Sequence, residues 1–359
     1  MSRKMFPILV VLLTLSFASC KVDFSPNAPW RDVPAVFCVL DPDEDTVWAR
    51  VQRCYLGEDN LYNYSEIADS NYYLPEDIQV SLLAWKGIHG PYNSLTKTNQ
   101  LVDRWELTYT TKPGKPEGSF PGGLQPLYYC VPGHSLVRDS DCVYQLVVVR
   151  SQTGDTLAQA TTTLVGYLRP AIHGRDTVEN VLISPSWTRG NEFGYRIGCR
   201  GELTWYALPR ARMYQPIVTF YYRKGGDTLS LDIAGPIVKN QHNSIMLSYQ
   251  RLTQERFLSV IKDYFKDNRD TLLTANNVDI NINACNEDLN AYISSQNNSV
   301  VSGQDFHSYS NIEGGVGIFG SRRTHIRVNV PCDSSGKEGY IPQQLISLGV
   351  GFYGNFGSK

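Results

Sequence analysis

Three glycines near the C-terminus have the spacing of a nucleotide-binding loop, in the segment Gly315-Val-Gly317-Ile-Phe-Gly320. In a dinucleotide site such a loop follows a strand and opens a helix, whose N-terminus meets the pyrophosphate. Here the chain continues through Ser321-Arg-Arg-Thr-His325 into a predicted strand at 324–330. The glycines therefore predict close backbone packing between strands rather than a nucleotide site.

Three aspartates alternate at Asp41, Asp43 and Asp45, as at the start of a calcium-binding loop. An EF-hand loop that begins at Asp41 would have glycine at the position of Thr46 and glutamate at the position of Gln52. Neither is present. The pattern favours a solvated hairpin turn, with a loose calcium site as the alternative.

The other residue types that support catalysis form no recognisable motif. The chain has six histidines, and none lies in His-Glu-x-x-His or at the spacing of zinc ligands. No Gly-x-Ser-x-Gly nucleophile motif occurs. Paired catalytic carboxylates converge only in the folded chain, so spacing alone does not identify them. We therefore predict no catalytic, cofactor-binding or metal-binding residue, and we expect a protein that is not an enzyme.

The chain has eight cysteines. Cys20 follows the leader, which leaves seven, and an odd number outside the cytosol implies at least one free thiol or an intermolecular bond. Cys130 and Cys142 flank a turn-like stretch, Val131-Pro-Gly-His134, and a bridge between them would close that loop. The remaining cysteines are interpreted as small hydrophobic core residues.

Asp-Thr followed by an aliphatic residue occurs five times. This pattern resembles the O-glycosylation sequon of exported Bacteroidetes proteins. The same residues are also favourable at hairpin turns, where aspartate bonds to the backbone and a strand follows. Both interpretations stay open. The candidate threonines are Thr46, Thr156, Thr177, Thr228 and Thr271.

The N-terminal residues have the features of an export signal. Arg3 and Lys4 precede an apolar stretch, Met5–Leu15, that is too short to span a bilayer. Phe17-Ala-Ser-Cys20 follows and resembles a bacterial lipobox. We predict a signal peptide at 1–19, lipid attachment at Cys20, and a lipid anchor and tether at 20–30.

Composition narrows the function classes. The 33 basic and 35 acidic residues give a formal charge of −2, whereas a nucleic-acid-binding protein needs a concentrated basic face. The 359 residues are enough for two domains. Aromatic residues make up 11% of the chain, with 29 glycines and 19 prolines, which favours many short strands.

The first domain is predicted at 31–168 as an antiparallel β-sandwich of the immunoglobulin-like or transthyretin-like kind. Strands at 35–40 and 46–54 form a hairpin, and Val47, Ala49 and Val51 alternate with polar or aromatic residues. With the turn centred on Asp43, Cys38 faces about Trp48. Further strands are predicted at 78–85, 104–110, 127–131, 143–151 and 156–165.

A boundary is predicted at 166–179, followed by a second β-rich domain at 169–359 with one or two short helices. In the helix near 254–267, Phe257, Val260, Ile261, Tyr264 and Phe265 form one apolar stripe. The stripe predicts packing against a sheet. A shorter helix is predicted at 287–295.

Aromatic residues offer a possible ligand platform, because their faces stack on sugar rings or peptide side chains. The alternative, which we favour, is packing within the sandwich. The candidates are Trp85, Trp105, Trp187, Trp205 and the tyrosine pairs at 72–73, 128–129 and 221–222.

Several stretches together resemble an uncharacterised family of Bacteroidetes outer-membrane lipoproteins, a domain of unknown function. They are Cys20, the segments 34–43, 47–53 and 55–57, and the segment 311–321. The resemblance covers nearly all of the mature chain and brings no catalytic residues. Members are often encoded beside TonB-dependent receptors, so the resemblance implies a non-catalytic accessory role in nutrient uptake.

The expected partners are the outer membrane, through the N-terminal lipid, and a TonB-dependent receptor; we expect no nucleic acid and no cofactor. The ligand and the face of the membrane are not determined by the sequence. Two other functions remain as alternatives: a surface glycan or peptide hydrolase, and a structural envelope or adhesion lipoprotein.

Overall fold

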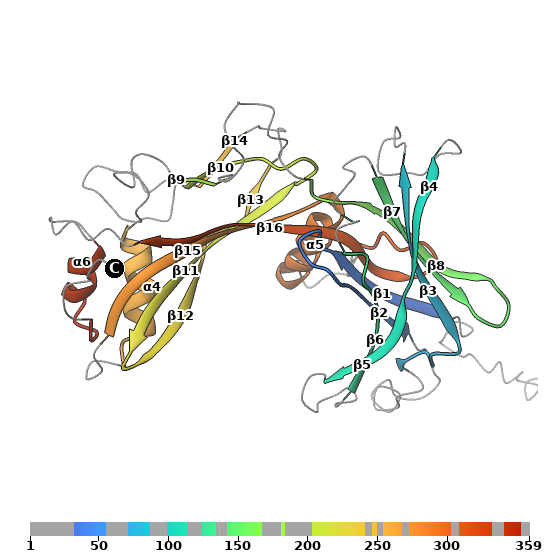
Figure 1. The fold of residues 1–359 in the computed structure, drawn as a ribbon, viewed down its shortest axis with the longest axis horizontal. Coiled ribbons are helices and arrows are strands. Elements are labelled where there is room, and N and C mark those ends of the chain that lie inside the picture. The colour runs from blue at the N-terminus through green and yellow to red at the C-terminus, as the bar shows by residue number, and fades with distance from the viewer. Residues whose placement is uncertain are drawn as a thin grey trace, which may run out of the picture.

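The computed structural model describes most of the chain from Asp32 to Phe352. The described ranges are 32–54, 71–86, 99–113, 124–133, 136, 142–166, 181–183, 203–240, 246–249, 254–267, 273–302, 309–331 and 341–352. The fold is mainly β, as the sequence predicts, with two lobes joined by one long strand (Figure 1). Within these ranges no helix has the length and apolar character needed to cross a membrane.

The N-terminal lobe is a sandwich of two sheets, because its strands bury one face and leave the other outside. One sheet contains β1 (Val33–Leu40), β2 (Val47–Cys54), β6 (Leu124–Cys130) and β5 (Thr108–Pro113). The facing sheet has the order β4 (Gln100–Glu106), β3 (Ile78–Lys86), β7 (Cys142–Arg150) and β8 (Thr156–Thr163). The apolar positions of both sheets meet in one buried core.

The C-terminal lobe packs helices on a curved part of the sheet. Its strands are β11 (Met213–Lys224), β12 (Asp227–Ala234), β13 (Val238–Lys239) and β15 (Leu273–Cys285), and its helices are α4 (Gln254–Tyr264) and α6 (Ile341–Ser347). A separate small sheet has the order β14 (Met246–Tyr249), β10 (Leu203–Tyr206) and β9 (Val181–Ile183). Aromatic side chains of β11 and α4 form much of this lobe's core.

A single strand, β16 (Val316–Pro331), belongs to both lobes. Its first residues pair in parallel with β1, from Ala35 with Val316 to Leu40 with Ser321. Its later residues pair antiparallel with β15, starting with Arg322 opposite Cys285. The largest sheet therefore runs without a break from β12 through β16 to β5. The sandwich that we predicted at 31–168 therefore also contains the first part of β16. We predicted antiparallel pairing throughout the sandwich, but β1 and β16 pair in parallel.

The glycines before and within β16 allow this close approach. Gly317 has a φ of 121°, and a Cβ there would collide with the carbonyl oxygen of Val36. A Cβ on Gly315 would collide with the carbonyl oxygen of Pro34. The predicted use of the glycine motif, close packing between strands, is confirmed.

The helices agree with the sequence in position but differ in extent. Phe257 and Ile261 of α4 and Phe265 just after it are buried, whereas Tyr264 is 51% exposed, so the apolar stripe is narrower than predicted. The helix predicted at 287–295 continues to Ser302 as α5 (Glu287–Ser302). The later residues of α5 are mostly Asn, Gln and Ser, which do not signal a helix. The helix α6 was not predicted.

Two strand predictions need correction. The strand predicted at 104–110 is two strands, because the chain crosses from one sheet to the other at Leu107, whose N–H donates to the Val80 carbonyl (2.8 Å). In the first hairpin Cys38 pairs with Ala49, one residue beyond the predicted partner Trp48.

Candidate functional site

The chain enters the sandwich at Asp32, and a cluster of polar side chains holds it there. The Asp32 carboxylate is 9% exposed. Arg150, at the end of β7, donates from Nη2 to Oδ2 (2.5 Å), and the Tyr73 hydroxyl donates to Oδ1 (2.7 Å). These contacts tie the first described residue to positions 41 and 118 residues further along the chain.

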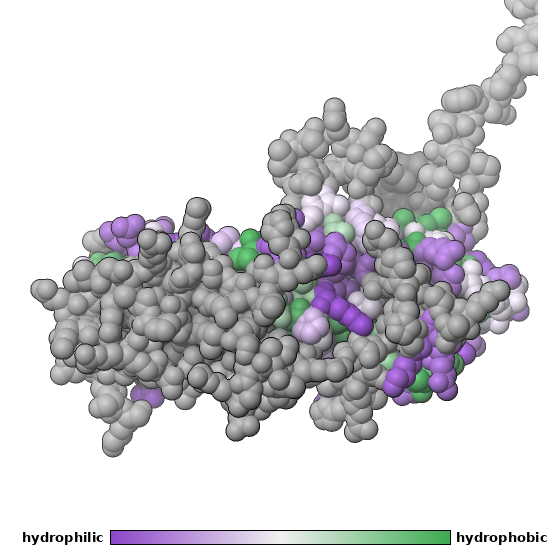
Figure 2. Space-filling view, turned by 90° about the horizontal axis from the view of Figure 1, so that it is seen from above, coloured by the Kyte–Doolittle hydropathy of each residue, from purple (hydrophilic) through white to green (hydrophobic). Residues whose placement is uncertain are grey.

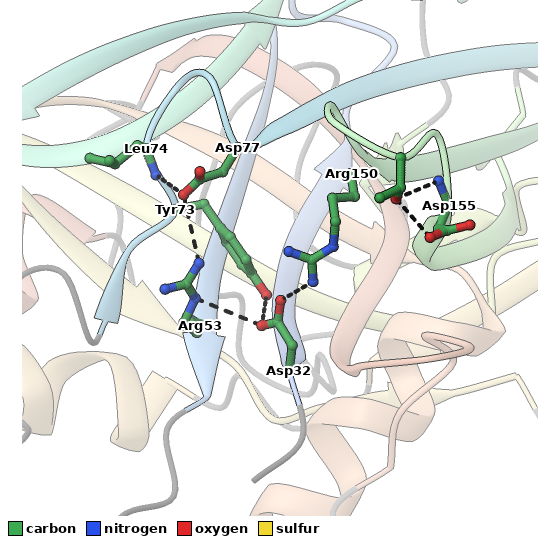
Figure 3. Close-up of polar contacts among 8 residues, drawn as sticks. Asp32, Arg53, Tyr73, Leu74, Asp77, Arg150 and Asp155 are labelled. Atoms are coloured by element: carbon green, nitrogen blue, oxygen red, sulfur yellow. Dashed lines mark hydrogen bonds and ion pairs between the residues drawn. The ribbon is translucent and has the colours of Figure 1, made fainter.

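Arg53, at the end of β2, completes this Asp32 cluster (Figure 3). Its Nε lies 3.7 Å from Asp32 Oδ1 and its Nη2 lies 3.6 Å from Asp77 Oδ2. Its guanidinium also lies over the Tyr73 ring, 4.6 Å from the centroid. Burial, followed by the hydrogen bond to Asp32, raises the pKa of Tyr73. The hydroxyl therefore stays protonated and keeps donating.

The Asp32 cluster is suited to holding the chain rather than to proton transfer. Both Asp32 oxygens accept hydrogen bonds, and Asp77 accepts from the Leu74 N–H (3.1 Å). Partly buried pairs with several hydrogen bonds of this kind fix geometry. Of these residues the sequence singled out only Tyr73, as a candidate for an aromatic platform, and Asp32 was missed because an aspartate just before a strand carries no distinguishing local signal.

The acidic turn between β1 and β2 contacts two arginines of β16. Asp41 Oδ1 accepts the Asp43 N–H (3.1 Å), and its Oδ2 accepts Arg322 Nε (2.9 Å). Asp43 Oδ1 accepts Arg323 Nη2 (2.6 Å). Arg323 is 2% exposed, so its charge depends on this partner. The turn thus uses two of its carboxylates to fasten β16, which the spacing alone did not indicate.

A buried polar cluster lies where β8, α5 and β16 meet, and Asn286 is its centre. Its side-chain amide donates to Thr162 Oγ1 (2.7 Å) and to the Thr163 carbonyl (3.0 Å). Its Oδ1 accepts the backbone N–H of Ser321 and of Leu289 (both 3.2 Å). The contact to Leu289 makes Asn286 the N-cap of α5. We call this group, with Asp288 and Tyr309, the joint cluster.

Asp288 is the half-buried acid of the joint cluster. Its carboxylate accepts hydrogen bonds from Thr162 Oγ1 (2.8 Å), Tyr309 Oη (3.1 Å) and Asn286 Nδ2 (3.3 Å). Burial raises the pKa of Asp288, while the hydrogen bonds oppose the rise. The donors come from β8, from the residue before α5 and from the segment between α5 and β16, so the acid fastens these parts of the chain together.

The outside of the β1-β2-β6-β5 sheet has a different character. The side chains that point away from the core form a surface that we call the outer sandwich face. It consists of the odd-numbered residues of β1 and β6 and the even-numbered residues of β2 and β5. Trp48 and Tyr129 pair across β2 and β6, with ring centroids 5.3 Å apart and planes at 31°. Lys112 Nζ lies 3.4 Å from the Trp48 ring centroid.

Charge on the outer sandwich face has one sign. Arg50 and Lys112 are its charged residues, and no aspartate or glutamate occupies a position of this face. Phe37 lies opposite Arg50 and is 36% exposed. Tyr292 of α5 meets Phe37 edge-on at 6.4 Å, so α5 borders the face on the β16 side. In the view from above, the described residues of the sandwich lobe are mostly hydrophilic, with a few small hydrophobic patches among them (Figure 2).

The predicted bridge between Cys130 and Cys142 is not formed. Both side chains are buried, on β6 and β7 of facing sheets, and no disulfide joins them. Burial raises the pKa of Cys130 and of Cys285 to about 12, so these thiols stay protonated and pack as small hydrophobic groups. Cys20, with the rest of 1–31, lies outside the described residues.

Three of the predicted glycosylation threonines are described. Thr156 and Thr228 are exposed and Thr46 is half-buried, each at the start of a strand after a turn. Thr177 and Thr271 lie outside the described residues. Exposure at hairpin turns agrees with both interpretations of the pattern, so glycosylation stays a prediction.

The aromatic candidates divide by position. Tyr73, Tyr128 and Tyr222 are buried in the cores. Trp105 packs against the sandwich core, and Trp85 donates from Nε1 to Gln145 (3.0 Å). Trp187 and the Trp205 side chain lie outside the described part. The sequence singled out Tyr129 only within a pair and missed Trp48 and Lys112, although the alternation along 47–52 places Trp48 on an outward face.

Comparison with known proteins gives no family. No family model matches the chain, and no curated protein matches it. Among solved structures, the chain is similar to the C-terminal domain of the AgI/II polypeptide BspA of Streptococcus agalactiae. The identity is 10% and the TM-score 0.16, over 70% of this chain and 94% of that one. A likeness at this level carries no argument about function.

Proposed function

We propose that the chain is a lipid-anchored accessory protein of the outer membrane that binds a TonB-dependent nutrient receptor, its ligand or both. The observation that carries the proposal is the Asp32 cluster. It fixes the sandwich at the point where the predicted tether ends. Asp32 is twelve positions after Cys20, a reach of about 40 Å at most.

The continuous sheet adds to this argument. Because β16 pairs with both β1 and β15, a protein held at Asp32 carries both lobes in one fixed relation. A body of this kind, kept close to the membrane, suits a protein that docks on a receptor or presents a ligand to it. The outer sandwich face supplies a surface with unpaired positive charge for such contacts.

The test is co-purification from native membranes. The chain is tagged after Lys359, extracted in mild detergent, and the proteins that elute with it are identified. We expect a TonB-dependent receptor in stoichiometric amount. The matched control is Cys20→Ser, which removes the predicted lipid site and leaves the folded body unchanged. This variant should leave the membrane fraction.

Two outcomes would contradict the proposal. If the wild-type protein elutes alone at high yield, the accessory role fails, and hydrolysis of glycans and peptides becomes the next screen. If Cys20→Ser stays in the membrane fraction as fully as the wild type, the predicted lipid anchor is wrong.

A further inference from the structure

The arginines of the described part divide into those held by acids and those left for another use. Arg50 is exposed on the outer sandwich face, and its guanidinium has no acidic partner within the described ranges. Six arginines form ion pairs with aspartate or glutamate: Arg53, Arg104, Arg150, Arg212, Arg322 and Arg323. An exposed arginine on a face without acids is available to a carboxylate from outside.

Lys112 is the second available cation. Its ammonium rests on the Trp48 ring, a weak contact at an exposed site. A ligand that carries a carboxylate can therefore draw the ammonium away from the ring. An apolar part of the same ligand can then pack against the ring. Tyr129 stands next to Trp48, so the aromatic surface extends over two adjacent strands.

The two basic residues come from separate strands of the outer sandwich face. Trp48 lies opposite Tyr129, which lies opposite Thr108, so Arg50 and Lys112 are two strands apart and offset by two residues. Strand spacing and rise per residue place their Cα atoms about 12 Å apart. That distance spans more than one unit of an extended oligosaccharide.

We propose that the outer sandwich face binds an acidic oligosaccharide whose sugar units carry carboxylates. The sugar rings present C–H faces to Trp48 and Tyr129, and the carboxylates meet Arg50 and Lys112. This inference rests on the proposed function, since it names the ligand that the accessory protein holds. A peptide rich in acids would use the cations but not the paired rings, so the oligosaccharide fits more of the face.

The test measures binding by calorimetry with the full chain in detergent. The probes are hexasaccharides of galacturonate, mannuronate and glucuronate, each compared with its carboxyl-reduced form. We expect at least one uronate to bind, and its reduced form to bind at least tenfold more weakly. A glutamate hexapeptide tests the competing chemistry and should bind at least tenfold more weakly than that uronate.

Variants locate the binding on the outer sandwich face. Arg50→Gln, Lys112→Gln and Trp48→Ala should each lower the affinity tenfold or more. The matched control is Arg104→Gln, which removes an exposed arginine from the facing sheet and should stay within twofold. Thermal melts of every variant confirm that the sandwich is folded.

Three results would overturn the inference: none of the three uronates binds, the glutamate peptide binds as tightly, or Arg50→Gln and Lys112→Gln bind like the wild type. Receptor co-purification shows whether the inference, the proposed function or both have failed. Uronate binding without a receptor removes the accessory role and keeps the inference. A co-purified receptor without uronate binding does the reverse.

Discussion

The joint cluster and the outer sandwich face treat polar groups in opposite ways. At the joint, Asn286 uses both ends of its side-chain amide and Asp288 accepts three hydrogen bonds, all within the chain. On the outer face, Arg50 and Lys112 have no acidic partner among the described residues, although the same lobe contains many acids. Polar groups at the joint specify the architecture, whereas in our proposal the two cations of the face serve a ligand.

This difference predicts a gradient of effects on stability. Substitutions at the joint and in the strand it fastens should cost several kcal/mol, because buried groups lose partners or collide. Substitutions of Arg50 and Lys112 on the outer face should cost almost nothing in stability and act on binding alone. Each prediction below tests one step of this gradient, starting with the largest.

Gly317→Ala should have the largest effect. Its φ of 121° is strained for any L side chain, and the new Cβ would strike the Val36 carbonyl oxygen. We expect a loss of about 3 kcal/mol or more in the free energy of unfolding, measured by urea denaturation. Gly226→Ala is the control, since its Cβ meets nothing within 4 Å. Equal stability of the two variants would contradict the close packing of β16 on β1.

Asn286→Ala should cost about 2–4 kcal/mol. It removes the N-cap of α5 and leaves the Thr163 carbonyl and the Ser321 N–H each without one partner. Urea denaturation measures the loss. Gln100, an exposed amide on β4, provides the control as Gln100→Ala. A cost below 1 kcal/mol at Asn286 would mean that the joint cluster does not hold the lobes together.

The joint also shows what a sequence leaves out. Local periodicity located β1, β2 and α4 because each alternation is complete within ten residues or so. It did not locate the pairing of β1 with β16, because those strands are about 280 residues apart and no local signal connects them. The glycine motif came nearest: it indicated close strand packing without naming Val36 as the neighbour.

Candidate site residues followed the same rule. The register of Trp48, Tyr129 and Thr108 depends on three strands from separate parts of the chain. The crossing at Leu107, which divides the strand predicted at 104–110, decides where Lys112 lies. The sequence placed Trp48 on an outward face but did not show which residues share that face.

Asp32→Asn should cost about 1–3 kcal/mol, less than the joint variants, because Arg150 is one-third exposed and water replaces part of its partner. The neutral amide no longer pairs with Arg150 and Arg53. Chemical denaturation at low and high salt measures the effect, and Asp263→Asn on α4 is the exposed control. If Asp32→Asn destabilises the protein no more than the control does, the Asp32 cluster does not hold the chain in place, and the proposed function loses its main support.

The pH dependence of stability should carry the sign of a raised carboxyl pKa at Asp288. The native state binds this proton more tightly than the unfolded chain, so the contribution of Asp288 is largest at low pH. It is lost as the pH rises from the ordinary value of 3.8 through the raised pKa. The difference in unfolding free energy between the wild type and Asp288→Asn should therefore shift against the wild type across this window. An opposite slope would mean that hydrogen bonding outweighs burial.

Arg50→Gln and Lys112→Gln should change the unfolding free energy by no more than about 0.5 kcal/mol each. Arg50 is exposed with no acidic partner among the described residues, and Lys112 loses only a weak contact with the Trp48 ring. Urea denaturation of both variants beside Asn286→Ala gives the two ends of the gradient in one experiment. If Arg50→Gln costs 2 kcal/mol or more, its guanidinium is part of the architecture, and the contrast between joint and face fails. If its stability is unchanged while its affinity for the uronate falls tenfold, the unpaired charge serves the ligand, because folding gains nothing from it.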